Sequence, residues 1–239
     1  MRLVFVGLLF ITAWSVFPQT ALSPYLELAR TPKTVLDYFL LCPTFLLDDQ
    51  GQLAWGSDPE LGEDVYNAKK KLLTTGYSVG DFQIQGVVVD VPNAYIQVKG
   101  QQHGFPFTLT VVFFDRKGQS NIPAFSYTST DGTSDVVRGQ MFELDPAGGW
   151  NDVTSDIVPD LRLKQLDNSS HKADIYPEVN WEFVLPRKGT TVLAVPHMTS
   201  QMSQKDPSSE DYLLVKRLLS RKIELRWDRV SGTFMGFVK

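Results

Sequence analysis

The sequence predicts an α+β protein, built from antiparallel β-sheet meanders with short helices on one face. Two observations favour this class. After Phe82, short runs rich in β-branched and aromatic residues follow one another between turn residues, as in consecutive strands. Other stretches carry apolar residues at helical spacing. Apolar residues make up 43% of the chain and aromatic residues 12%, which is enough for a packed core.

The first two dozen residues are typical of a secretory signal peptide. Arg2 is the only charge before Glu27, and a nearly unbroken apolar run from Leu3 to Phe17 follows it. A positive start, an apolar segment of this length and a small residue, Ala21, indicate export and cleavage. The run is shorter than the roughly 20 residues that span a bilayer, although an uncleaved anchor is the alternative. We therefore expect residues 1–21 to be removed, leaving a periplasmic or secreted protein with no membrane span.

Two helices are expected before the strands. Thr31 and Pro32 supply an N-cap and a first-turn proline, and Pro43 ends the first helix near Leu41. The second helix is expected across residues 58–76, where apolar residues recur on one face. Three lysines lie towards its C-terminal end, where cations complement the helix dipole.

Four strands on short links are expected from residue 82 onward. In one of them apolar residues alternate with polar ones, which predicts a strand with one buried face; the apolar set is Phe107, Leu109, Val111 and Phe113. Residues 128–140 are rich in Gly, Ser, Thr and Asp, and we expect a polar loop there.

The second half repeats this order loosely. We expect a short helix capped by Asn151 or Asp152, followed by a hairpin around residues 186–189. A helix with a Ser208 capping box and a closing hairpin should end the chain. Residues 165–174 and 199–209 are expected to be loops. We therefore expect a first half at residues 22–128 and a second at 141–239, either as a duplicated unit or as one continuous domain.

The sequence carries no recognisable signature of nucleic-acid binding, metal binding or catalysis. The formal net charge of −4 disfavours a nucleic-acid partner. None of the three histidines (His103, His171, His197) has metal-ligand spacing, and neither a phosphate loop nor a Gly-x-Ser-x-Gly elbow occurs. The single cysteine, Cys42, is flanked by apolar residues and is expected to be a buried thiol. We expect no metal, no cofactor and no identifiable catalytic residue.

Four residues are the best candidates for a binding site. Arg187 and Lys188 place two cations on a turn made stiff by proline and glycine, in an otherwise acidic chain. Trp150 and Asp152 lie in a Gly-bearing segment, and tryptophan is common at binding hot spots. Together they would contact an acidic protein or envelope component. The alternative for the cations is a solvated turn with no partner.

An ordered set of segments resembles a family of exported bacterial proteins of unknown function. The more specific segments are WNDVTSDIVP and LPRKGTT; the others are TVLDYFLLCP, VVVDVPNAYIQV, TLTVVFF and LRWDRVSGTF. The resemblance implies a secreted or periplasmic origin and a helix-plus-sheet fold, and it supplies no activity. The loops at 128–140 and 199–209 and Cys42 depart from the pattern. We therefore expect an exported, non-enzymatic binding or inhibitory module; the alternatives are a hydrolase with a loop-assembled active site and a structural envelope protein.

Overall fold

The computed structural model describes residues 33–41, 46–47, 53–54, 62–130, 135–144, 150–168 and 176–238. The expected signal peptide at residues 1–21 lies outside the described residues. The same is true of Cys42, Trp55 and the expected N-cap Thr31.

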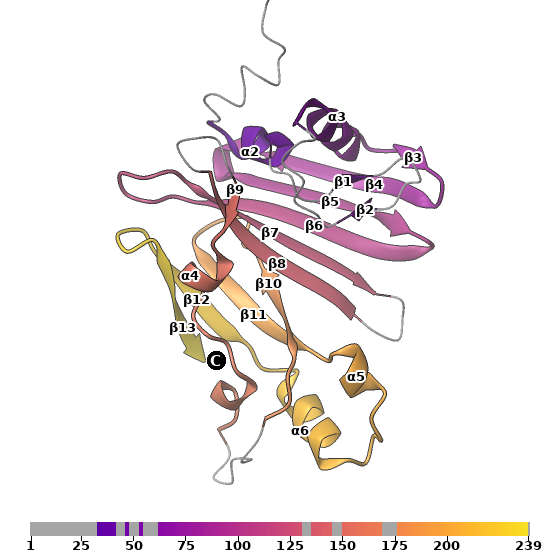
Figure 1. The fold of residues 1–239 in the computed structure, drawn as a ribbon, viewed down its shortest axis with the longest axis vertical. Helices are drawn as coiled ribbons and strands as arrows, with labels where there is room; N and C mark the ends of the chain where they lie inside the picture. Colours follow the sequence, from indigo (N-terminus) through magenta and orange to yellow (C-terminus); the bar gives the residue numbers. More distant parts are fainter. Residues whose placement is uncertain are drawn as a thin grey trace, which may run out of the picture.

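The fold is predominantly antiparallel β-sheet, so the expected α+β class is wrong. A seven-stranded and a four-stranded sheet dominate it, and the helices are few and short (Figure 1). The seven-stranded sheet is a meander of β3 (Ser78–Val79), β4 (Phe82–Asp90), β5 (Tyr95–Gln102), β6 (Phe105–Phe114), β7 (Ile122–Thr130), β8 (Asp135–Leu144) and β9 (Trp150–Asp152). The four-stranded sheet contains β10 (Asn180–Val184), β11 (Thr191–His197), β12 (Ile223–Asp228) and β13 (Thr233–Val238). A small pair, β1 (Leu46–Leu47) and β2 (Leu53–Ala54), stands apart.

In the polar stretch expected as a loop at residues 128–140, residues 128–130 belong instead to β7 and residues 135–140 to β8. The ladder between the two strands runs from Ala124 with Met141 to Thr130 with Asp135. Composition misleads here because β6 already offers a full row of hydrogen-bond partners to β7. Tertiary pairing of this kind overrides the weak strand preference of Gly, Ser and Asp.

Two helices cover one face of the large sheet (Figure 1). They are α2 (Val35–Leu41) and α3 (Gly62–Leu72). The first begins later than expected, because Thr34 and Asp37 form its cap. The backbone N–H of Thr34 donates to Asp37 Oδ2 at 2.8 Å, and the N–H of Asp37 donates to Thr34 Oγ1 at 3.3 Å.

The core beneath these helices contains apolar residues from α2, α3 and strands β4 to β8, including Phe39, Leu72, Phe82, Ile96, Leu109 and Phe125. Lys69, in the last turn of α3, is fully buried there. Its ammonium lies 4.8 Å from the ring centroid of Phe39 and 5.5 Å from that of Phe125. The lysine is therefore part of the packing of this face, by cation–π contact, as well as a complement to the helix dipole.

The four-stranded sheet packs on the opposite face of the large sheet. Three helices accompany it: α4 (Thr154–Ile157), α5 (Ser200–Ser203) and α6 (Glu210–Leu218). The cap of α6 is Ser209, one residue after the expected Ser208, and α5 lies within the expected loop at 199–209. Both expected hairpins of the second half, β10–β11 and β12–β13, are present.

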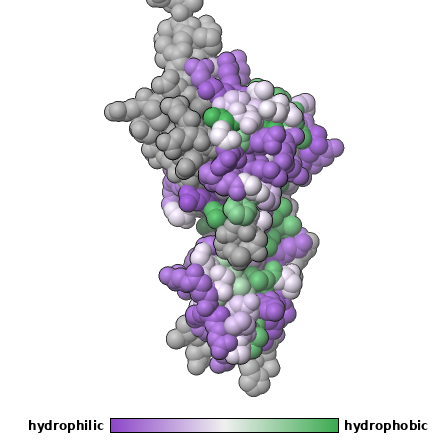
Figure 2. Space-filling model, turned by 90° about the vertical axis from the view of Figure 1, so that its right-hand side faces the viewer, coloured by the Kyte–Doolittle hydropathy of each residue, from purple (hydrophilic) through white to green (hydrophobic). Residues whose placement is uncertain are grey.

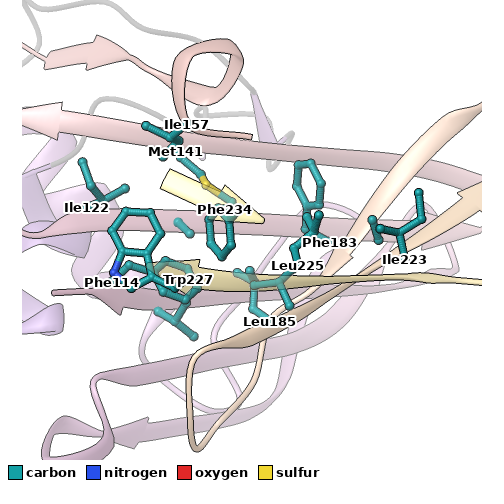
Figure 3. Close-up of a cluster of buried hydrophobic side chains, with 14 of the residues drawn as sticks. Phe114, Ile122, Met141, Ile157, Phe183, Leu185, Ile223, Leu225, Trp227 and Phe234 are labelled. Carbon is teal, nitrogen blue, oxygen red and sulfur yellow. The ribbon is translucent and has the colours of Figure 1, made fainter. Parts of the chain in front are cut away.

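A second core fills the space between the two sheets (Figure 3). The ring of Phe114 on β6 lies 5.3 Å from Trp227 and 4.9 Å from Phe234, centroid to centroid. The predicted alternation along β6 is confirmed, since Leu109 faces the helices and Phe114 faces the second sheet. The expectation of one buried face is incomplete, because both faces are covered over the C-terminal part of the strand.

The large sheet crosses the expected boundary between the halves, because β8 and β9 belong to it. Asp115, which follows β6, lies in contact with Trp227 and Arg229 of the β12–β13 hairpin. Arg229 Nη2 lies 2.7 Å from Asp115 Oδ2, and Trp227 Nε1 donates to the carbonyl of Asp115 at 2.8 Å. These residues join a turn of one sheet to a turn of the other.

Hydrophilic residues cover most of the described surface on the face drawn in Figure 2, and hydrophobic ones gather near its narrow middle. Within the described residues, none of the helices has the length and apolar character needed to cross a bilayer.

Candidate functional site

Two hollows lie where β10 meets residues 158–164, which follow α4. One hollow of about 640 Å³ contains Arg162, Lys164 and Tyr176 in its lining, and a second of about 520 Å³ contains Asp152 and Phe183. Asp160, Leu161 and Trp181 line both. The two hollows therefore adjoin at Trp181, and we call them together the Trp181 groove.

The α4 end of the Trp181 groove is built by the Asp-Val-Thr segment. Asp152 Oδ1 accepts hydrogen bonds from the backbone N–H of Thr154 at 2.9 Å and from its hydroxyl at 2.6 Å. The same hydroxyl oxygen accepts from the N–H of Met141 at 2.8 Å, and Gln140 Nε2 donates to Asp152 Oδ2. These bonds tie α4 to strand β8 and fix this end of the groove. The expected cap by Asn151 or Asp152 is wrong, because the N-cap of α4 is Val153, which makes no side-chain cap hydrogen bond.

The other end is fixed by a buried carboxylate. The hydroxyl of Tyr176 donates to Asp167 Oδ2 at 3.0 Å, and Arg217 Nη2 of α6 lies 3.2 Å from the same oxygen. Asp167 has only 2% of its side chain exposed. Arg221 Nη1 donates to the carbonyl of Leu166 at 2.7 Å. The aromatic ring of Tyr176 is therefore held in place before any ligand arrives.

A second polar cluster joins the two sheets. His197 Nδ1 lies 2.9 Å from Asp135 Oδ2 on β8, and its Nε2 lies 2.8 Å from Glu182 Oε2 on β10. The cluster borders a hollow of about 270 Å³ that Ser129 and neighbouring threonines of β6 and β7 also line. We call these three residues the His197 cluster.

The geometry of the His197 cluster is that of a charged cross-link. The hydrogen bond to Glu182, and to a smaller degree the one to Asp135, raises the pKa of His197 above its ordinary value, against the effect of burial. With carboxylates at both ring nitrogens, both nitrogens donate, so the ring has no free lone pair to accept a proton. Ser129 lines the same hollow, but its hydroxyl donates to the carbonyl of Pro106 at 3.2 Å. Among the described residues, the hydrogen-bond partners of His197 are the two carboxylates, and no serine donates to its ring.

The four sequence-predicted site residues occupy two places. Trp150 and Asp152 lie on β9; the Trp150 ring packs edge-on against Tyr38, 5.9 Å between centroids, and Asp152 lines the Trp181 groove. Arg187 and Lys188 lie on the β10–β11 turn, where Arg187 Nε donates to Asp90 Oδ2 at 2.8 Å. Among the described residues, no hydrogen bond, ion pair or ring contact joins the two pairs, and their shared contact with an acidic partner stays a prediction.

Sequence reasoning did not single out Trp181, Glu182 or Asp135. The hairpin expected around residues 186–189 carried a usable signal, because its register puts Asn180 beside His197 and so brings Glu182 onto the same face. Asp135 carried none, since it fell in the stretch expected to be a loop. Within the described residues, no group of three His, Cys, Asp or Glu side chains is arranged to hold a metal ion.

No protein-family model and no curated protein matches the chain. Among solved structures, a domain of an uncharacterized protein from Porphyromonas gingivalis W83 is similar at a TM-score of 0.44 and 10% sequence identity. That comparison covers 74% of this chain and 89% of the other.

Proposed function

We propose that this chain is an exported, non-enzymatic binding protein that holds an extended segment of a partner protein in the Trp181 groove. The observation that carries the proposal is the meeting of two hollows, of about 640 and 520 Å³, at the half-buried Trp181. Hollows of this size fall in the range of ligand sites. The export of the protein rests on the apolar leader that follows Arg2.

The lining of the groove favours a polypeptide ligand. Tryptophan, tyrosine and arginine, the residue types enriched at interface hot spots, are all present as Trp181, Tyr176 and Arg162. Charges of both signs border them, and Arg162 Nε donates to Asp160 Oδ2 at 2.6 Å. A ligand that alternates apolar and polar groups fits such a surface, as an extended peptide does. The negative net charge of the chain makes a nucleic acid a poor ligand.

The proposal is tested by panning a phage-displayed library of random linear peptides on the wild-type protein. Enriched peptides are then measured against Trp181→Ala and Lys164→Glu. Lys164 is exposed, so its replacement leaves the core intact even if the tryptophan variant folds poorly. We expect both changes to weaken binding, Trp181→Ala by more than tenfold because hot-spot truncations cost about 2 kcal/mol or more.

Leu213→Ala is the matched control, because Leu213 is 53% exposed on α6 and does not line the groove. It should bind the enriched peptides as the wild type does. Failure to enrich any peptide, or equal binding by all variants, would contradict the proposal. Cleavage of the enriched peptides during incubation would favour the hydrolase alternative, and loss of that cleavage in His197→Ala would assign it to the His197 cluster.

A further inference from the structure

In the described part of the chain, β4 is an open edge of the large sheet over residues 86–90. Strand β3 pairs only with Phe82 and Gln83, and the next contact, from residues 76–77, ends at Ile84. From Gly86 to Asp90, the described part of the chain places a strand beside β4 on one side only, where β5 pairs with it. The outward N–H and C=O groups of such an edge are a template for another extended chain.

The open edge is apolar and short. Val88 is 37% exposed and Val89 43% exposed, and Val91 just beyond is 41% exposed. No charge falls between Gly86 and Val89, whereas edge strands are commonly protected by lysine or proline. The register shift between Ile84 and Gly86 ends the stretch on one side and Pro92 ends it on the other. Its length suits one extended segment better than a broad sheet-to-sheet interface.

Two cations stand at the C-terminal end of this edge. The β10–β11 turn places Arg187 against Asp90, and Lys188 follows it, exposed, on the same turn. Asn93 Nδ2 also donates to both oxygens of Asp90, at 3.0 and 2.9 Å. Arg187 keeps 57% of its side chain exposed while it pairs. Two positive charges against one carboxylate leave this end of the edge positive.

We propose that the edge of β4 from Gly86 to Asp90 binds an extended apolar segment of a partner protein in antiparallel register, with acidic residues at the segment's N-terminal end. The sheet is antiparallel throughout, and antiparallel pairing is the more stable kind. Antiparallel addition puts the N-terminus of the incoming segment beside Asp90, and hence beside Arg187 and Lys188. This is a strand-addition surface separate from the Trp181 groove.

The test uses acetylated synthetic peptides of alternating valine and threonine. One carries glutamates at its N-terminal end, one carries glutamates at its C-terminal end, and one carries glutamines in place of the glutamates. We expect the first to bind most tightly, by roughly threefold to tenfold over the others, and this preference should shrink at high salt. Hydrogen exchange should show new protection at amides between Gly86 and Asp90 on binding.

Val88→Lys should weaken binding of every peptide by roughly tenfold, because a lysine on the edge blocks strand addition. Val230→Lys is the matched control, since Val230 is 79% exposed in the β12–β13 turn, and it should bind as the wild type does. Lys188→Glu should abolish the preference for N-terminal glutamates. No binding, no protection on β4, or no dependence on the position of the glutamates would overturn the proposal. A wild-type dimer in sedimentation that Val88→Lys makes monomeric would also overturn it, by assigning the edge to a second copy.

Discussion

The surroundings of His197 determine its pKa and its role in joining the two sheets. Its ring is held between carboxylates from two different strands, Asp135 on β8 and Glu182 on β10, and only 19% of its side chain is exposed. Of the described titratable groups, these two carboxylates are the ones that face the imidazole; the polar residues of β6 and β7 that border the hollow carry hydroxyls. The charged ring therefore cross-links the two sheets.

Stability should depend on pH through His197 in a definite direction. The pKa of His197 is raised by folding, so its contribution is complete below the unfolded value of about 6.5 and is lost as pH rises through the higher folded value. We expect His197→Ala to lower the free energy of unfolding by about 1.5–3 kcal/mol at pH 6, the usual value for hydrogen bonds to charged groups. The loss should be smaller at pH 9. Urea unfolding of both proteins across this range measures it, and a difference that grows with pH would contradict the assignment.

The two sheets pack closely where Gly139 of β8 meets Phe183 of β10. A Cβ added at Gly139 would lie 2.2 Å from Cδ2 and 2.9 Å from Cε2 of Phe183. The missing side chain at Gly139 thus makes room for a phenylalanine ring of the core between the sheets. The sheets could not approach this closely at β8 if this residue carried a side chain.

Gly139→Ala should therefore destabilise the protein by about 1–3 kcal/mol, the usual cost of adding a methyl group to a filled core. Gly86→Ala is the control, because a Cβ there would meet nothing within 4 Å. The midpoint of urea unfolding measures both. Phe183→Leu combined with Gly139→Ala should recover part of the loss, and strictly additive losses would show that the two residues are not in contact.

The sequence predicted local elements better than the class of fold. Turn residues, which are a local property, predicted hairpins β10–β11 and β12–β13. The two-residue period of a strand, also local, predicted the alternation of Phe107, Leu109 and Val111. The hairpin of β7 and β8 was missed because its pairing depends on β6, a neighbour that composition does not show. This omission also hid the size of the large sheet, and so led to the α+β class.

The candidate sites were predictable only in part, for a related reason. Asp152 was singled out from a local motif, and it lines the Trp181 groove. Trp181 was not among the predicted site residues, because alternation along β10 shows which face it occupies but not that residues 158–161 leave a hollow beside it. The packing of β10 against β8, which brings the His197 cluster together, likewise cannot be read from either strand alone.

At the scale of the whole molecule, the central claim is that a partner segment occupies the Trp181 groove. The most direct measurement is the nuclear magnetic resonance signal of each tryptophan indole N–H during titration with a peptide enriched by panning, with Trp181→Phe to assign the key signal. We predict a saturating shift of the Trp181 signal, while the Trp227 signal stays in place, because the Trp227 ring is buried and its N–H already donates to the carbonyl of Asp115. An unmoved Trp181 signal at saturating peptide would contradict the account.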